Sequence, residues 1–492
     1  MAPAELSSPG LMMMFRSRPS DQRHSLANQN LEMATYTTSS AKPFPLQDIE
    51  AESATDPSAI SAARVVLIAV LVTAPWAFGA VEPWAWMGLG LAASVVLFLW
   101  GWGGIQQKLV RLTWSPLYVP LGLFFLLGIA QYLLGRALDR SQTQQALVLL
   151  AADLTLFFVS LQLFSRASRA NWHAFGVAVV LLAGSLGLFA TLQFAAGEPR
   201  IYGEVATPSN MLFGPYVNPN HFAGLMEMLI PVAVLYIAER YGKRSWSLLA
   251  WLAVGAILAI ASLLLSGSRG GLLALIAEAV IAIAVLRSRS GRLRRRSLAM
   301  IVAGMVIGAV LLFTWVDPGI VARKLALIAN PTGEPAWLEW ASFRKVVAFD
   351  ALHIVRDYPL AGVGLGNFET AYPRYQSFPS DLWIDYAHND YVQAIADTGL
   401  LGAVLIAFAL VLFVPLAFGN KSLGAATDGR WIQLGAALGC CGMLVHSFFD
   451  FNLHIPANAA WFAVLAGVAT ANLQGRDDRD AGQRGKVVTL YR

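Results

Sequence analysis

Charged residues and cysteines are both scarce in this sequence. Only 13% of its 492 residues are charged, whereas 57% are hydrophobic. Soluble globular proteins carry roughly 25% charged residues, so this composition excludes an ordinary soluble protein. The two cysteines, Cys440 and Cys441, are adjacent within an apolar run. That placement argues against a disulfide framework and against a cysteine metal cluster.

Several motifs of common enzyme classes are absent as well. The sequence has no zinc or calcium ligand spacing and no Gly-x-Ser-x-Gly motif. The stretch "GVGLGNF" (362–368) lacks the Lys-Ser and the βαβ context of a nucleotide-binding loop, so we interpret it as a tight turn. The arginine run "RSRSGRLRRR" (287–296) is typical of a cytoplasmic loop between membrane helices. We therefore expect no metal, no other cofactor and no nucleic-acid partner.

Long apolar runs are abundant. Runs of about 20 apolar residues are long enough to cross a bilayer as helices, because a helix rises ~1.5 Å per residue and the hydrocarbon core is ~30 Å thick. The sequence therefore predicts an all-α polytopic membrane protein with about twelve transmembrane helices that contact membrane lipids. The expected spans are 64–82, 85–103, 115–135, 145–164, 173–195, 221–239, 247–265, 270–287, 298–315, 398–418, 432–451 and 456–474.

The positive charges indicate the orientation. Among the short loops, fifteen Lys and Arg residues fall on the side of the two tails, against four on the other side. Cytoplasmic loops carry the excess of positive charge, so both termini are expected in the cytoplasm. The predicted organisation is a disordered cytoplasmic tail (1–62), nine helices (63–315), a long extracytoplasmic segment (316–397), three helices (398–474) and a second cytoplasmic tail (475–492).

The extracytoplasmic segment 316–397, called the outer segment below, is too long for a simple link. It contains apolar residues at helical spacing, and Pro359 is expected to end that helix. We predict an amphipathic helix that lies on the membrane surface or caps the bundle. Its apolar positions are Trp337, Trp340, Phe343, Val347, Ala351 and Ile354.

Arg269 is the first candidate for a functional residue. It stands in "SGSRGG" (266–271), a short outer connection, against the bias of positive charge to the cytoplasm. An arginine fork and a helix N-terminus both suit a phosphate or diphosphate group. The alternative is an arginine that extends to lipid headgroups.

His388 is the second candidate. In "AHNDYVQ" (387–393) it stands where a helix is expected to begin and to run until Gly399. A helix N-terminus disfavours imidazolium, so the ring would be neutral and able to accept a proton. Asp385 or Asp390 could orient the ring. The alternative is a histidine that only caps the helix.

Other polar residues are expected on the same extracytoplasmic side as Arg269 and His388. Asn218, Asn220 and His221 in "NPNHFAG" (218–224) form either a backbone-capping turn or part of a site. In "HSFFDFNLHIP" (446–456), His446, Asp450 and His454 form either a functional or a structural network. Two acids within spans, Glu227 and Glu278, are interpreted as hydrogen-bond partners between helices.

These motifs give the chain a resemblance to a known family. "NPNHFAG", "SGSRGG", "RDYPLAGVGLGNF", "AHNDYVQAIADTGLLG" and "HSFFDFN" occur in this order over roughly residues 200–460. Their order and spacing, with the long outer segment before the last helices, resemble the O-antigen ligase and polymerase superfamily of bacterial envelope glycosyltransferases.

The resemblance implies a metal-independent, inverting glycosyl transfer outside the bacterial inner membrane. A glycan would move from undecaprenyl diphosphate to a sugar hydroxyl of lipid A-core or of a growing polymer. Arg269 matches the family's diphosphate-binding arginine and His388 its essential histidine, with Asn389 beside it. A second arginine is expected before the Asn-Pro-Asn motif. Arg200 is the candidate, and Arg344 on the outer helix is its substitute.

Two alternatives stay open. A polymerase that extends an exopolysaccharide or O-antigen chain differs from a ligase only in its acceptor, and the shared motifs do not separate the two. A lipid-linked glycan transporter belongs to another class. The number of spans suits a transporter, but the sequence shows no inverted repeat and its polar groups gather on one face.

Overall fold

The computed structural model is α-helical, as the sequence predicts. It describes residues 57–472, apart from 109, 111, 199, 207–211, 242–245, 290–298, 300–302, 304–306, 308–335, 380–382 and 420–428. Most of the predicted N-terminal tail (1–56) and the predicted C-terminal tail (475–492) lie outside these residues. The first helix, α1, begins at Ser58 directly after Pro57, ahead of the predicted start at residue 64.

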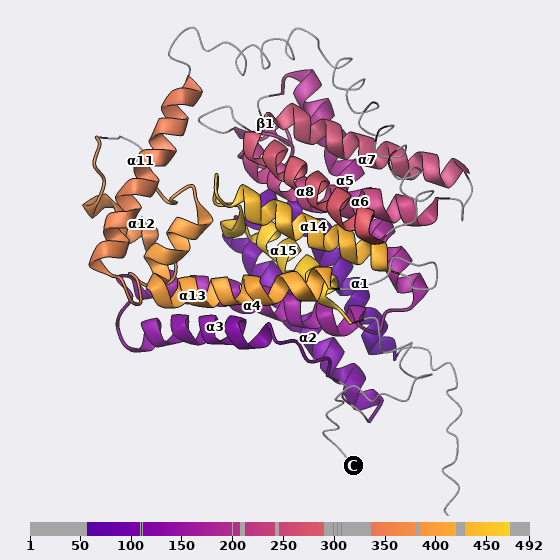
Figure 1. The fold of residues 1–492 in the computed structure, drawn as a ribbon, viewed down its shortest axis with the longest axis horizontal. Coiled ribbons are helices and arrows are strands. Elements are labelled where there is room, and N and C mark those ends of the chain that lie inside the picture. Colours follow the sequence, from indigo (N-terminus) through magenta and orange to yellow (C-terminus); the bar gives the residue numbers. More distant parts are fainter. Residues whose placement is uncertain are drawn as a thin grey trace, which may run out of the picture. The chain divides into compact units, whose positions relative to one another are not determined.

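Thirteen helices are described in this part of the chain (Figure 1). They are α1 (Ser58–Thr73), α2 (Pro83–Gln106), α3 (Tyr118–Leu133), α4 (Arg140–Phe164), α5 (Arg169–Ala196), α6 (Pro219–Arg240), α7 (Trp246–Ser266), α8 (Arg269–Arg289), α11 (Ala336–Asp357), α12 (Phe368–Ala371), α13 (Asp390–Phe418), α14 (Arg430–His446) and α15 (Pro456–Thr470). The 3-10 turns are η1 (Ala74–Trp76), η2 (Phe78–Ala80), η3 (Tyr372–Arg374) and η4 (Asn452–His454), and strands β1 (Arg200–Ile201) and β2 (Val205–Ala206) form a small antiparallel hairpin.

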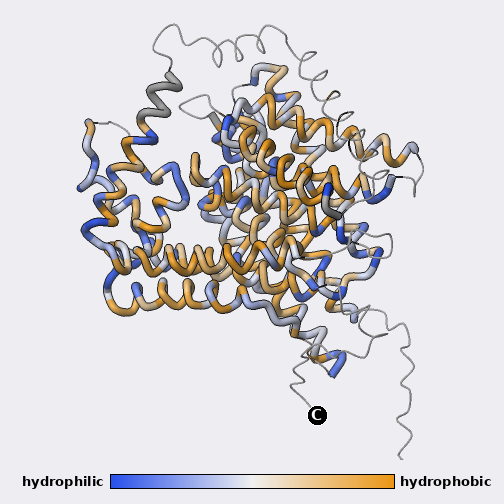
Figure 2. The backbone as a smooth tube through the Cα atoms, in the orientation of Figure 1, coloured by the Kyte–Doolittle hydropathy of each residue, from blue (hydrophilic) through white to orange (hydrophobic). Residues whose placement is uncertain are grey.

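Eight of the described helices are long and apolar enough to cross a membrane, and α3 and α15 are shorter apolar helices. Figure 2 shows that the helices are mainly hydrophobic along their length. The predicted all-α membrane class is therefore confirmed. The number of twelve spans stays a prediction, because most of the expected span 298–315 lies outside the described residues.

Helix α6 is the most deeply buried of these eight candidate spans. Its candidate span is 89% buried, and it packs against α5, α7, α8, α14 and α15. Gly435 and Gly439 of α14 lie directly against the backbone of α6, where a methyl group would overlap it. Small residues let membrane helices approach closely, and this contact fixes α14 against α6.

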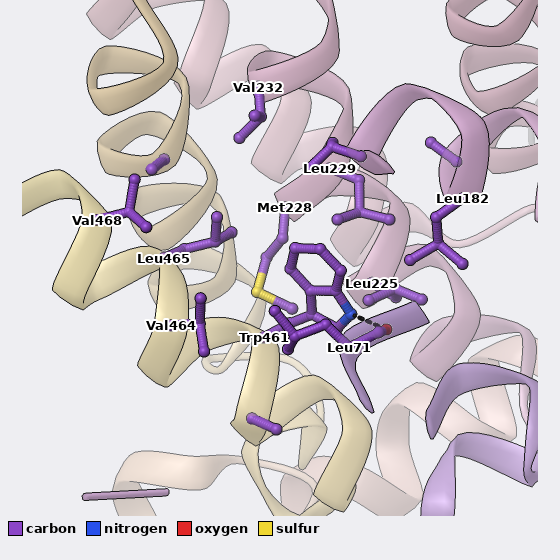
Figure 3. Close-up of a cluster of buried hydrophobic side chains, with 14 of the residues drawn as sticks. Leu71, Leu182, Leu225, Met228, Leu229, Val232, Trp461, Val464, Leu465 and Val468 are labelled. Atoms are coloured by element: carbon purple, nitrogen blue, oxygen red, sulfur yellow. Dashed lines mark hydrogen bonds between the residues drawn. The ribbon is translucent and has the colours of Figure 1, made fainter. Parts of the chain in front are cut away.

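A large hydrophobic core joins the first helices to the last ones. Trp461 of α15 lies among Leu71, Leu225 and Met228, as Figure 3 shows. Its indole Nε1 donates a 2.9 Å hydrogen bond to the carbonyl of Leu71, so the buried polar atom is satisfied. This core holds α15 and α1 together, although the two residues are 390 positions apart.

The amphipathic helix of the outer segment is confirmed as α11. Val347, Ala351 and Ile354 are fully buried, as the apolar spacing predicts. They pack in a second, separate core with side chains of α12, η3 and the start of α13, beside which α11 lies in Figure 1. The helix therefore covers protein with this face. The side chains of 336–342 lie outside the described residues.

The glycine-rich stretch 362–368 forms a tight turn, which confirms that interpretation. Gly362, Gly364 and Gly366 all have positive φ, a conformation that other residues adopt at a cost. The amides of Val363 and Gly364 donate 3.0 Å hydrogen bonds to the carbonyls of Ala396 and Asp397 on α13. The turn therefore fastens the outer segment to α13.

Gly399 interrupts α13 where the sequence predicts the helix to end. Its φ of 64° breaks the helical geometry, and the amides of Leu400 and Leu401 donate to the carbonyls of Pro359 and Leu360. The first two turns of α13 thus belong with the outer segment, and the apolar remainder begins after the break.

Candidate active site

Three segments of the chain converge on one buried carboxylate, Asp450. It lies between α14 and α15 and its side chain is fully buried. Asn220 donates to Oδ2 at 2.8 Å, and Arg344 donates to the same oxygen at 3.2 Å. His388 Nδ1 lies 3.4 Å from Oδ1, and His221 Nε2 lies 3.7 Å from it. We call these five residues the Asp450 cluster.

The cluster stabilises the ionised form of its carboxylate. Burial raises the pKa of Asp450, but the polar contacts with the rings of His221 and His388 and the positive charge of Arg344 outweigh burial. Together they hold the pKa of this carboxyl well below its usual range. A buried anion in contact with two imidazole rings can orient them and can stabilise positive charge on either ring.

His388 is strained and directed toward Asp450. Its φ is 50°, a left-handed conformation that costs energy for a residue with a side chain. The predicted helix start is confirmed, but Asn389 is the capping residue. Its side chain accepts from the amides of Tyr391 and Val392 and donates to the carbonyl of Phe448 at 3.1 Å.

The carboxylate that contacts the His388 ring nitrogen is neither of the two expected ones, although Asp385 interacts with His388 through charge. The sequence suggested Asp385 or Asp390, whereas the carboxylate at its ring is Asp450, 62 positions away. Asp390 instead bonds to Ser447 and His454. The carboxylate at Nδ1 favours a proton on that nitrogen, which leaves Nε2 able to accept one.

The start of α6 both forms a capping turn and contributes residues to the site, which are the two alternatives that the sequence left open. Asn218 caps the helix, since its side chain accepts from the Asn220 amide at 2.9 Å. The side chains of Asn220 and His221 instead reach the Asp450 cluster. The His221 ring also contacts Phe451 edge-on, at 4.6 Å between ring centroids. The "NPNHFAG" motif therefore combines a cap with two cluster residues.

Arg269 is the exposed first residue of α8. The Ser268 hydroxyl caps this helix by accepting from the Gly271 amide at 3.2 Å. Gly270 lies against the ring of His446, where a methyl group would overlap it. His446 ends α14 four positions before Asp450, so this contact brings the helix start with Arg269 to the same end of α14 as the cluster.

The two alternative arginines differ in position. Arg200 is an exposed residue of the β1–β2 hairpin, and the structure does not bring it into the Asp450 cluster. Arg344 on α11 belongs to the cluster and also donates to the carbonyl of Phe449 at 2.8 Å. The substitute candidate is therefore the arginine that lies beside His388.

Two further carboxylate–histidine pairs surround the cluster. His446 Nδ1 lies 2.9 Å from Glu227 Oε2, which confirms Glu227 as a partner between α6 and α14. His454 Nδ1 lies 2.8 Å from Asp390 Oδ1. Within the described part of the chain, no three or more His, Cys, Asp or Glu side chains form a group that could hold a metal ion.

The central role of Asp450 was missed from the sequence. Its motif "HSFFDFN" was noticed, but the sequence offered no way to choose between a functional and a structural network. The available signal was one acidic residue at the outer end of a span, with a histidine four positions before it and another four positions after it. Only the tertiary structure shows that Asp450 faces His388 and His221.

The apolar helices and the polar cluster at their ends define the class as a multi-pass α-helical membrane protein. Residues 254–407 match the family model described as O-antigen ligase. The resemblance to the O-antigen ligase superfamily is thereby confirmed, and a glycosyltransferase-like activity is implied. The matched range contains Arg269, Arg344, His388 and Asn389, whereas Asp450 lies beyond it. No curated protein matches the chain.

Proposed function

We propose that this protein is a metal-independent, inverting glycosyltransferase that moves a glycan from undecaprenyl diphosphate to a sugar hydroxyl. The observation that carries the proposal is the contact of His388 with the buried, ionised Asp450. This arrangement provides an oriented base, and the packing of Gly270 against His446 brings an exposed arginine, Arg269, to the same end of α14. The family match supports the same reaction class.

His388 is the base in this proposal. Asp450 holds the proton on Nδ1, so Nε2 takes the proton of the acceptor hydroxyl as its oxygen attacks the anomeric carbon. The ring becomes an imidazolium, which the carboxylate stabilises. The bond from the anomeric carbon to the diphosphate breaks on the opposite face, and the configuration is inverted. Such proton transfer contributes about 10²–10⁴-fold to a rate.

Arg269 binds the leaving diphosphate. Negative charge develops on the diphosphate as the bond breaks, and a fixed guanidinium stabilises it together with the N-terminus of α8. Arg344 is held by Asp450 and by the Phe449 carbonyl, so its contribution is to fix the cluster and to add positive charge near the donor. Arg200 is a further candidate for the donor, from outside the cluster.

The reaction takes place on the extracytoplasmic side of the bacterial inner membrane, with both termini in the cytoplasm. The distribution of positive charge in the loops supports this orientation. The acceptor is lipid A-core if the enzyme is a ligase and the growing chain if it is a polymerase.

Purified protein in detergent, supplied with lipid-linked glycan and either acceptor, tests the proposal. Transfer is expected without ATP or added metal. His388→Gln keeps a hydrogen bond to the hydroxyl but cannot take its proton, so kcat should fall by about 10²–10⁴-fold. Arg269→Ala should abolish transfer and weaken donor binding. Arg269→Lys should be partly active, because a point charge does not reproduce the guanidinium fork.

Matched controls lie on α11. His353 and Arg356 are exposed, and His353→Gln and Arg356→Ala should transfer at the wild-type rate. If His388→Gln also turned over like wild type, orientation of the hydroxyl would suffice and the base role would be wrong. An Arg269→Ala variant with normal donor binding would make Arg269 a lipid-headgroup residue only.

A further inference from the structure

The loop that carries Asp450 is closed at both ends by one side chain, that of Asp390. At the first end, the Ser447 hydroxyl donates to Asp390 Oδ2 at 2.8 Å, and the Asp390 amide donates to the Ser447 carbonyl at 2.9 Å. At the second end, the Leu453 amide donates to Oδ2 at 3.3 Å and His454 Nδ1 lies 2.8 Å from Oδ1. Asp450 stands midway between these two ends.

Asp390 also lies two positions after His388, at the first residue of α13. Its side chain is 6% exposed, and every hydrogen bond named above joins Asp390 to the loop 447–454. Asp390 therefore joins the chain segment that carries His388 to the loop that carries Asp450. A shift of the Asp390 side chain would move the Asp450 carboxylate away from the His388 ring.

Neighbouring contacts depend on the same alignment. The Tyr386 ring stacks on Phe451, with 4.1 Å between ring centroids and 12° between ring planes. His454 Nε2 lies 3.2 Å from the side-chain Nε2 of Gln393. The side-chain Oε1 of Gln393 accepts a 2.9 Å hydrogen bond from the backbone amide of Ala387. The residues on both sides of the strained His388 are thus tied to the loop.

We infer that Asp390, held by His454, is a positioning residue that sets the placement of Asp450 against His388. The inference rests on the proposed function, because it concerns the same transfer. Asp390 does not touch a reacting atom in this account. It fixes the loop so that the buried carboxylate meets Nδ1 and the His388 ring keeps Nε2 toward the acceptor.

Asp390→Asn is the sharpest substitution. Asparagine has nearly the same volume, but only one of its two terminal atoms accepts a hydrogen bond. Either His454, which contacts Oδ1, or both Ser447 and Leu453, which contact Oδ2, therefore lose their acceptor. The kcat of transfer should fall by about 10–100-fold, as for other groups that orient a catalytic residue. The donor KM should stay unchanged, since Arg269 is untouched. Asp357→Asn, which alters an exposed carboxylate bonded to Tyr375, is the control and should match wild type.

Two further measurements separate positioning from general stability. Nitrogen NMR of the His388 ring should show a proton fixed on Nδ1 in wild type and a mixture of tautomers in Asp390→Asn. In a double-mutant cycle, Asp390→Asn should cost little once Asp450→Asn is present, because both changes break the same contact.

Different results overturn different claims. Unchanged kcat and unchanged His388 signals in Asp390→Asn would overturn the inference. A lower kcat with a lower unfolding temperature and unchanged His388 signals would also overturn it, and would leave Asp390 with a role in stability alone. Absence of transfer by wild type would refute the proposed function, while the NMR comparison would still decide the inference.

Discussion

At the scale of residues, the Asp450 carboxylate is the group that the four other residues of the cluster contact. Asp450 bonds to Asn220 across 230 positions and to Arg344 across 106. Breaking a buried charge pair by removing one partner costs about 3–5 kcal/mol, because the other charge stays buried and unpaired. The Arg344 side chain is 30% exposed, so solvent screening lowers this cost for its pair with Asp450.

The pair formed by His454 and Asp390 gives a pH-dependent prediction. Burial lowers the pKa of His454, but the hydrogen bond and charge of Asp390 and the charge of Asp397 raise it above the usual value. The contribution to stability is therefore complete below about pH 6.5, the unfolded value, and is lost as pH rises through the folded pKa. The gap in unfolding free energy between wild type and His454→Gln should be on the order of 1 kcal/mol near pH 6.

Thermal unfolding in detergent at several pH values measures this gap. It should shrink as pH increases toward 9, because the histidine of the wild type then loses its charge. A gap that stayed constant or widened over this range would contradict the pairing of a charged His454 with Asp390.

At the scale of elements, glycines decide how closely the site-bearing helices approach. Gly270 at the start of α8 has no room for a side chain against His446, and Gly439 of α14 has none against Met228 of α6. These contacts place Arg269, the cluster and the start of α6 at one end of the bundle. The glycines of "SGSRGG" thus have a packing role beside the capping role of Ser268.

Gly270→Ala should displace the start of α8 and with it Arg269. The added methyl group costs about 1–3 kcal/mol if the helix must shift. We expect the donor KM to rise by about tenfold, which corresponds to roughly 1.4 kcal/mol. The measurement is a donor titration in the transfer assay.

Gly90 on α2 provides the matched control, because a methyl group there meets nothing within 4 Å. Gly90→Ala should leave the donor KM unchanged. If Gly270→Ala folded normally and bound donor like wild type, the contact of α8 with His446 would not be what places Arg269.

At the scale of the whole molecule, the orientation in the membrane decides which compartment the site faces. In a variant without Cys440 and Cys441, a single cysteine at position 380 should react with an impermeant thiol reagent in intact cells. A cysteine at position 427 should react only after the cells are opened. Both positions lie outside the described residues. Protection of position 380 would refute the extracytoplasmic site.

The sequence alone determined the features that depend on local pattern. Apolar runs of helical length gave the membrane class, and the spacing of Val347, Ala351 and Ile354 gave the buried face of α11. The glycines of 362–368 indicated the turn after that helix, where the structure has Gly362, Gly364 and Gly366 at positive φ. These features need only neighbours along the chain, because helix period, chain length and backbone freedom are local properties.

The tertiary structure alone decided the partners. Asp385 and Asp390 were close to His388 in sequence, but the carboxylate at its ring is Asp450. Likewise Arg344, rather than Arg200, lies in the cluster. Such contacts join helices that are far apart in the chain, and they form only when small residues let α6, α8 and α14 pack closely. A sequence motif names the chemical groups, whereas packing between distant helices determines which of them meet.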